Sequence, residues 1–207
     1  MAKTLRDMGT NRLESFSDGV IAVAITLLVL GIAVPDPART PQLAHSLGRQ
    51  WPTYAAYVTS FLTIGIIWIN HHAMIGRLRA ADHSILVLNL LLLMSIGILP
   101  FATNLMATYL TQSHGQVTAA AVYGGAFLVM GVLFAAVNRQ ILFGRPQLLA
   151  TELPRDQRRL ILRRSMSGLP PYAAATALAF VSPYITLGIC AALAAYYAFP
   201  LASSSGG

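Results

Sequence analysis

A carboxylate lies inside the first apolar segment of this 207-residue chain. The segment 12–30 reads RLESFSDGVIAVAITLLVL, with Arg12 and Glu14 at its head and Asp18 further in. On insertion scales, a charged side chain at the centre of a membrane helix costs roughly 2.5–3.5 kcal/mol. Such a residue is retained where it faces the interior of a helix bundle and has a partner. We therefore expect groups that donate hydrogen bonds beside Asp18.

Candidate donors lie on the same segment and on the next two apolar segments. They share a polar N–H or O–H group at a similar expected depth: Ser17, Trp68, Asn70, His71, His72 and Asn89. Indole, imidazole and amide N–H groups all donate to a carboxylate. A structural scaffold is favoured over an ion-binding site. The predicted polar network joins the first three helices and consists of Arg12, Phe16, Ser17, Asp18, Trp68, His71, His72 and Asn89.

The adjacent histidines also raise the question of a metal or haem site. Neighbouring residues on a helix point about 100° apart, so His71 and His72 cannot easily bind one ion, whereas zinc sites use spacings such as i, i+4. A haem pair needs histidines at one depth on two helices, and the other histidines fall in loops or at segment ends. No Ser or Cys nucleophile motif accompanies Asp18 and His71. We predict no metal, no cofactor and no enzymatic activity.

The composition is typical of a membrane protein. Hydrophobic residues make up 56% of the chain and charged residues 10%, against roughly 25% charged residues in soluble domains. The single cysteine, Cys190, excludes an intrachain disulfide framework and a cysteine-based metal cluster. The net charge of +7 does not indicate a nucleic-acid partner, because most basic residues fall between apolar runs, where they set membrane topology.

Hydropathy predicts an all-α integral membrane protein with one six-helix domain over residues 1–201. Each predicted span has about the 20 residues that a bilayer requires. The first run lacks a cleavage site and is expected to be retained. The fifth contains Pro170 and Pro171, so the last two segments form either spans or a hairpin that does not fully cross. The predicted spans are 14–34, 51–75, 84–110, 116–142, 165–181 and 184–201, followed by a tail or truncation scar over 202–207.

The basic residues are distributed unequally between the two sides of these spans. With the N-terminus inside, 12 of the 14 Lys and Arg residues lie on one side, leaving Arg39 and Arg49 outside. The positive-inside rule then places both termini in the cytoplasm. The basic run 152–164 is predicted to form a short amphipathic helix whose arginines touch lipid headgroups.

The first segment also resembles a known family. Arg12, Phe16, Ser17 and Asp18, followed by an apolar tail, are similar to the R-x-x-x-F-S-D first helix of the transmembrane protein 175 family. That family comprises the lysosomal potassium channel of animals and smaller bacterial and archaeal relatives. The resemblance covers roughly residues 12–110 and continues beyond only in hydropathy. Further matching positions are Trp68, His71, His72, Asn89, Pro100 and Phe101.

The resemblance implies that the first helix lines a pore. The family's apolar constriction falls five, nine and twelve residues after the motif aspartate, at Val23, Leu27 and Leu30, and Thr26 adds a hydroxyl. Hydropathy alone leaves open whether this face meets lipid, protein or a pore. Val23 stands where a bulkier isoleucine is typical, which would widen the narrowest ring. No Thr-Val-Gly-Tyr-Gly filter occurs, so apolar rings that favour weakly hydrated ions would give modest potassium selectivity.

One pore-lining helix per protomer cannot enclose a pore, so closed cyclic symmetry is expected. The resemblance implies a homotetramer in the lipid bilayer of a bacterial or archaeal plasma membrane, with potassium as the permeant ion. A secondary transporter or proton-coupled exchanger remains the alternative, with Asp18 and His71 as its proton relay.

Overall fold

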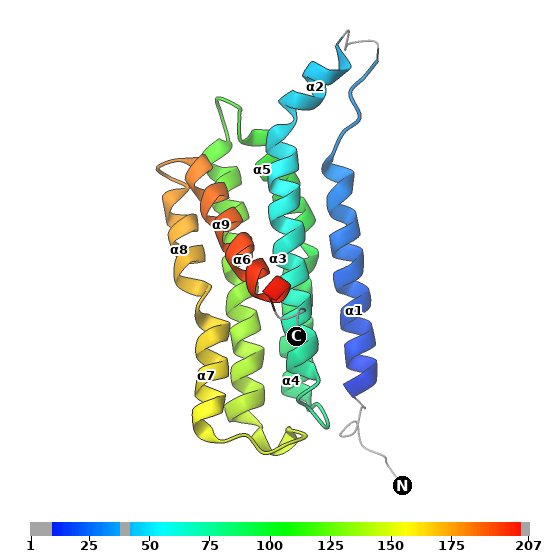
Figure 1. Cartoon of the computed structure of the whole chain (residues 1–207), viewed down its shortest axis with the longest axis vertical. Helices are drawn as coiled ribbons and strands as arrows, with labels where there is room; N and C mark the ends of the chain where they lie inside the picture. Colours follow the sequence, from blue (N-terminus) through cyan, green and yellow to red (C-terminus); the bar gives the residue numbers. More distant parts are fainter. Residues whose placement is uncertain (1–9, 38–41, 204–207) are drawn as a thin grey trace.

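The computed structural model describes residues 10–37 and 42–203, and within these its secondary structure is helical, without a β-strand. This confirms the all-α prediction. Long helices stand side by side along the long axis of the molecule (Figure 1). In chain order the elements are α1 (Thr10–Leu27), η2 (Leu28–Gly31), α2 (Leu43–Arg49), α3 (Trp51–Ile75), α4 (His83–Gly97), α5 (Leu99–Tyr109), α6 (Gln116–Arg139), η3 (Gln140–Gly144), η4 (Pro146–Leu148), α7 (Arg155–Met166), α8 (Leu169–Leu178) and α9 (Pro183–Ser203).

Four helical segments of the described chain are long and apolar enough to cross a membrane. They agree with the first four predicted spans to within a few residues at each end. The α1 segment continues through the 3₁₀ turn η2, and the α6 segment continues through the π-helical turn η3. The four segments are Thr10–Gly31, Trp51–Ile75, His83–Tyr109 and Gln116–Gly144.

The third of these segments is interrupted between α4 and α5. Pro100 has no N–H and its ring clashes with the carbonyl of Ile96, one turn earlier, so regular hydrogen bonding stops here. The intervening Ile98 keeps right-handed helical dihedral angles of −85° and −13°. The chain therefore continues as one apolar segment of 27 residues.

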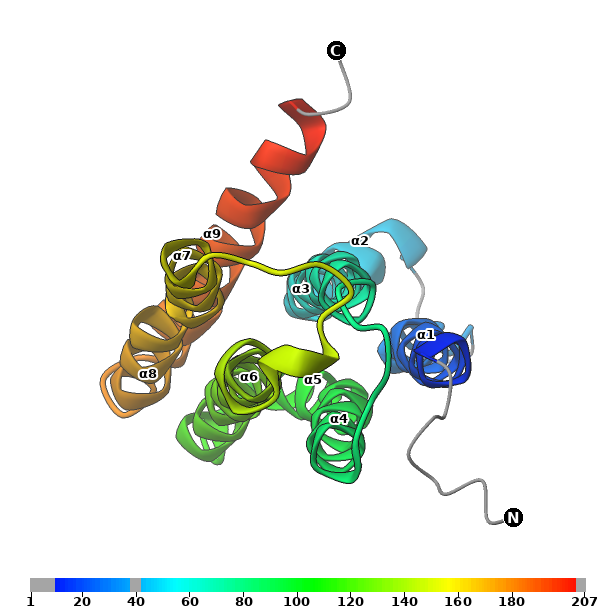
Figure 2. The ribbon, with the colours of Figure 1, turned by 90° about the horizontal axis from the view of Figure 1, so that it is seen from below.

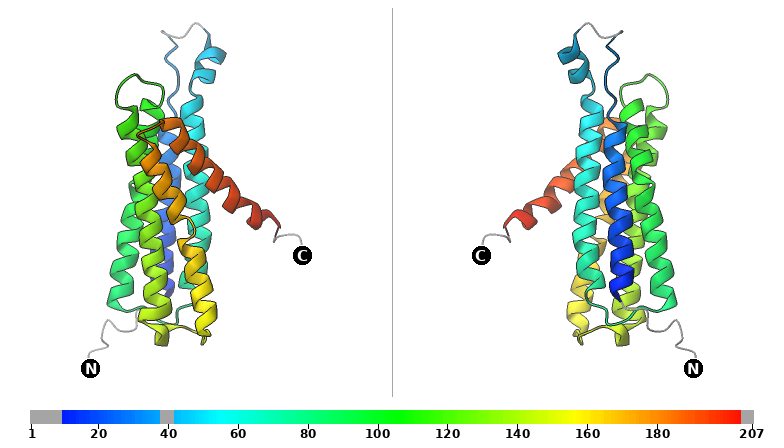
Figure 3. Two further views of the ribbon diagram at one scale, coloured as in Figure 1. Left: turned by 90° about the vertical axis from the view of Figure 1, so that its left-hand side faces the viewer. Right: turned by 90° about the vertical axis from the view of Figure 1, so that its right-hand side faces the viewer.

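The predicted segment 184–201 corresponds to α9, whereas the predicted segment 165–181 contains the end of α7 and all of α8 instead of one continuous helix. The helix expected in the basic run 152–164 is present as α7, and α8 follows it end to end beside α6 (Figure 1). Pro170 and Pro171 start α8 because proline is tolerated in the first helical turn. α9 begins beside α8 and slants away from the bundle (Figure 3). It continues to Ser203, into the predicted tail 202–207, of which residues 204–207 lie outside the described chain.

Hydroxyl and aromatic side chains join the helices in the interior. The Ser60 hydroxyl lies 2.8 Å from that of Thr103 and 3.1 Å from that of Tyr123, which links α3, α5 and α6. The Phe127 ring packs edge-on against Tyr123 at 4.8 Å and stacks on Tyr172 of α8 at 5.6 Å. Such hydrogen bonds and close contacts hold helices together in lipid, where apolar side chains gain nothing by leaving the solvent.

The loop after α3 is hydrogen-bonded to the loop before α7. The Arg79 N–H donates to the Leu148 carbonyl (2.9 Å), and the Ala150 N–H donates to the Arg77 carbonyl (2.8 Å). These two bonds hold the ends of α3 and α6 together and fix the backbone of Arg77.

α6 and α8 approach each other closely at Gly124. A Cβ atom on Gly124 would lie 3.1 Å from the Cα and 3.0 Å from the Oγ1 of Thr176, whereas on Gly125 its nearest neighbour would be the Thr176 Cγ2 at 3.9 Å. We predict that Gly124→Ala lowers stability by about 1–3 kcal/mol through overpacking. Gly125→Ala should be neutral or stabilising, because alanine favours the helix.

The measurement is the apparent melting temperature of each purified variant in detergent. It is the temperature at which half of the size-exclusion peak is lost after heating. Equal melting temperatures for the two alanine variants would contradict the close packing of α6 on α8.

Candidate functional site: the first helix and its polar contacts

One face of α1 is buried against the rest of the bundle. Leu13, Ser17, Ile21, Ala24 and Leu28 are buried, and their spacing of three or four residues places them on one side of a helix. This side packs on α3 and α4, and α1 lies at the edge of the bundle (Figure 2). Four of the five side chains are apolar, and Ser17 is the exception.

A directional chain of hydrogen bonds runs through this buried interface. The Ser17 hydroxyl donates to the Leu13 carbonyl (2.8 Å), and the Asn89 Nδ2 donates to Ser17 Oγ (3.0 Å). The Asn89 Oδ1 then lies 2.7 Å from the His71 Nε2. An amide oxygen only accepts, so Nε2 of His71 carries the hydrogen and donates. All three polar side chains are fully buried.

The His71 ring has one further feature. Its Nδ1 is buried and makes no hydrogen bond with any described residue. Because Nε2 donates to Asn89, the neutral ring presents Nδ1 as an acceptor without a partner. The histidine therefore acts through one nitrogen only in this arrangement.

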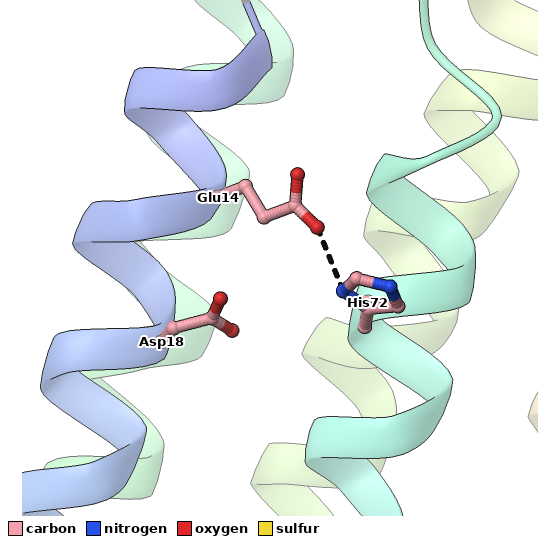
Figure 4. Close-up of side chains that lie close together, drawn as sticks. All are labelled: Glu14, Asp18 and His72. Carbon is pink, nitrogen blue, oxygen red and sulfur yellow. Dashed lines mark ion pairs between the residues drawn. The ribbon is translucent and has the colours of Figure 1, made fainter.

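A second, more exposed cluster lies on the neighbouring side of α1. The Trp68 indole Nε1 donates to Asp18 Oδ1 at 2.9 Å. One helical turn away, the His72 Nδ1 lies 2.7 Å from Glu14 Oε1 (Figure 4). The His72 side chain is 63% exposed and that of Glu14 26%, so solvent screens the pair and its contribution to stability is small.

The same cluster has the residue types of a metal site. Glu14, Asp18 and His72 each offer one ligand atom, and these atoms lie within 4.8 Å of one another. Exposed acidic groups commonly lie together without a metal ion, and this group contains three possible ligands. The absence of a structural metal therefore remains a prediction from the sequence.

The structure divides the predicted network into two parts. Trp68 is the hydrogen-bond donor to Asp18, whereas His71 donates to Asn89 and Asn89 donates to Ser17. Within the described chain, no hydrogen bond joins Asp18 to His71. The carboxylate–histidine relay of the predicted alternative thus lacks a direct contact.

Three further residues depart from the predicted network. Arg12 is exposed, and its guanidinium makes no hydrogen bond or ion pair with the residues described. Phe16 is 56% exposed and lies outside both clusters. Glu14 was not expected as a member, although its position four residues before Asp18 places both carboxylates on one face of a helix.

The four pore candidates lie on the face of α1 that points away from the rest of the chain. Val23 is 56% exposed, Leu27 44% and Leu30 75%. Thr26 is exposed, and its hydroxyl donates to the Val23 carbonyl at 2.9 Å. An open apolar groove of about 550 Å³ follows this face between Phe16 and Leu27.

We predict that the buried hydrogen bonds from His71 through Asn89 to Ser17 stabilise the fold. Asn89→Leu leaves Ser17 without its donor and His71 without its acceptor, and each unsatisfied buried group costs about 1–3 kcal/mol. On the same helix, the buried Ser95 hydroxyl donates to the carbonyl of Leu92, which the helix itself can satisfy. Ser95→Ala is the matched control and should lower the melting temperature in detergent much less. Equal losses in both variants would refute the structural role of the chain.

The sequence and the fold were compared with those of known proteins. Residues 12–100 match the family described as Endosomal/lysosomal potassium channel TMEM175. A potassium channel of Streptomyces collinus is 40% identical over 190 residues, which are 92% of this chain and 92% of the relative. A potassium channel of Chamaesiphon minutus is 40% identical over 191 residues, 91% of this chain and 93% of the relative.

The fold agrees with a solved structure of the same group. The crystal structure of a lysosomal potassium-selective channel TMEM175 homolog from Chamaesiphon minutus superimposes with a TM-score of 0.82 at 37% identity. The match covers 92% of this chain and 97% of that chain. The chain therefore belongs to the TMEM175 family, whose members are ion channels of the membrane and not enzymes.

Proposed function

We propose that this protein is a potassium-permeable channel, a homotetramer whose pore is lined by α1. The observation that carries this proposal is the exposed face of α1. Val23, Leu27 and Leu30 are 56%, 44% and 75% exposed in the protomer, while the opposite face of the same helix is buried. The potassium channels among its relatives support the same ion.

A channel requires several copies of this chain. Each protomer offers one helix with this exposed face, and one helix cannot surround an aqueous path. Closed rotational symmetry brings equivalent faces around a common axis. Four copies are expected from the family resemblance.

The chemistry of the exposed face suits a weakly hydrated cation. Apolar rings at Val23, Leu27 and Leu30 supply no oxygen ligands, so they favour ions that part with water easily and they close by dewetting. The Thr26 hydroxyl uses its hydrogen on the Val23 carbonyl, which leaves its lone pairs as acceptors. A ring of such oxygens would favour cations over anions.

The exchanger alternative has less support from the site. A proton relay between Asp18 and His71 needs a direct hydrogen bond or a bridging group. Asp18 instead accepts a hydrogen bond from Trp68, and His71 donates to Asn89. The indole N–H of Trp68 is a donor only, so it cannot accept a proton and relay it. This arrangement favours a scaffold for a channel.

We also propose six spans with both termini in the cytoplasm of a bacterial or archaeal cell. The predicted fifth span 165–181 contains the end of α7 and all of α8, which lie beside α6 (Figure 1), and residues Pro183–Phe199 of α9 are apolar. These would form the fifth and sixth crossings. The start of α7 and the loop after α3 lie at the same end of the bundle (Figure 1), and both carry arginines, in agreement with the positive-inside rule. Arg39, assigned to the opposite side, lies outside the described residues.

The constriction can be tested by bilayer recording of the purified protein under a potassium–sodium gradient. Leu30→Ser should let water into the narrow region and raise the conductance. It should also move the reversal potential towards the value expected for equal potassium and sodium permeability. Val29→Ser adds the same hydroxyl to the preceding residue, whose side chain is also exposed but points elsewhere around the helix. Unchanged conductance and reversal potential in Leu30→Ser would remove this face from the pore.

The oligomeric state is tested separately. The protomer has a mass of 22.2 kDa, and we predict that mass measurement in detergent gives four protomers per particle. Cross-linked bands up to the tetramer should appear in native membranes. A monodisperse monomer that still conducts potassium would refute the assembly.

A further inference from the structure

A cavity of about 820 Å³ lies among α3, α6, α7, α8 and α9. Of these helices, α7, α8 and α9 lie on the side of the bundle away from α1 (Figure 2). Its wall includes Ser167 and Gly168, where α7 gives way to α8, and the Ser167 hydroxyl lies 2.7 Å from the Tyr197 hydroxyl of α9. Its volume falls in the range of about 300–1,000 Å³ typical of small-molecule sites.

The polar part of this cavity is positively charged. Arg77, Arg163 and Arg164 line it, and its lining contains no Asp or Glu. Their guanidinium groups form no hydrogen bond or ion pair with the residues that the structure describes. In contrast, Arg158 of the same α7 donates to two backbone carbonyls, at 2.7 and 3.4 Å. Three unpaired cations in one wall create a potential that attracts an anion.

Arg77 has the strongest need for a counter-charge. Its backbone is fixed by the hydrogen bond from Ala150, and its side chain is half-buried. Burial lowers the pKa of Arg77, because the charged group loses water without gaining a partner. An anion beside it would replace the lost hydration.

The deeper part of the cavity is apolar. It lies between the two apolar helices α3 and α6, close to the ends at which the arginines gather. A soluble anion would leave this apolar wall without a partner, whereas a molecule with an anionic head and hydrocarbon chains would cover both parts. The apolar wall includes Ile66, Ile67, Met130, Phe134 and Leu169.

We propose that this cavity binds an anionic phospholipid, with its phosphate at Arg77, Arg163 and Arg164 and its acyl chains along the apolar wall. Basic pockets between membrane helices on the cytoplasmic side recognise headgroups in this way. The proposal requires a membrane-embedded chain and does not depend on where the pore lies.

Native mass spectrometry of the purified, delipidated full chain tests this proposal. The protein is titrated with dioleoyl phosphatidylglycerol and, separately, with zwitterionic dioleoyl phosphatidylcholine. The first should bind at least tenfold more tightly. Arg163→Gln with Arg164→Gln should weaken phosphatidylglycerol binding about 30-fold, since each basic residue near an anionic headgroup contributes a factor of about five.

The matched control removes the same charge from the same helix outside the cavity. Arg155 and Arg159 are exposed residues of α7 that do not line it, and Arg155→Gln with Arg159→Gln should change the affinity less than threefold. Equal weakening by both double variants, or equal affinity for the two lipids, would overturn the proposal. Displacement of phosphatidylglycerol by millimolar inorganic phosphate would also overturn it, because the site would then belong to a soluble anion.

Discussion

The hydrogen bonds from His71 through Asn89 to Ser17 fix the rotation of α1 about its own axis. α1 is apolar on nearly all sides, so packing in lipid gives little preference for one rotation over another. A serine hydroxyl and an amide inside a membrane have no water to replace a lost partner. Rotating α1 would leave both unsatisfied. The face that carries Val23 and Leu27 is therefore held outward by a contact on the opposite side of the helix.

This arrangement separates two roles that the first helix must combine. Its buried face is specified by a few polar atoms, and its exposed face is free to vary in size. A change such as valine for isoleucine at position 23 alters the exposed surface and leaves the contacts of Ser17 untouched. In the proposed channel, pore width could thus change without a change in the packing of α1 on α3 and α4.

The sequence was sufficient for the four long spans, and it indicated Trp68 as one of six candidate donors to Asp18, of which the structure shows Trp68 bonded to it. Continuous apolar runs are a strong constraint with few solutions, and a carboxylate inside such a run requires a hydrogen-bond donor nearby. The different partners of His71 and His72 were not predictable. Adjacent helical positions must diverge by about 100°, but the pattern does not say which ring turns inward to Asn89 and which turns outward to Glu14.

The C-terminal helices were harder to predict from the sequence for a related reason. Hydropathy is averaged over a window of about 20 residues, and the window over 165–181 spans the end of α7, the break at Gly168 and all of α8. Two short helices and one longer helix give the same average. Only the contacts with α6, which are distant in sequence, distinguish them.

The 3₁₀ turn η2 has a geometric consequence for the end of α1. A helix that continued to Pro35 would bring its ring against the carbonyl of Gly31, and the chain leaves the helix at Ile32, whose backbone is extended. Residues three apart eclipse one another on a 3₁₀ helix and advance by about 6 Å, against about 4.5 Å on an α-helix. Leu27 and Leu30, separated by this turn, therefore stack along one line parallel to the helix axis. Repeated around a symmetry axis, they would form two successive hydrophobic rings whose side chains are aligned along the axis. An ion would then pass two aligned rings instead of side chains that are staggered around the axis.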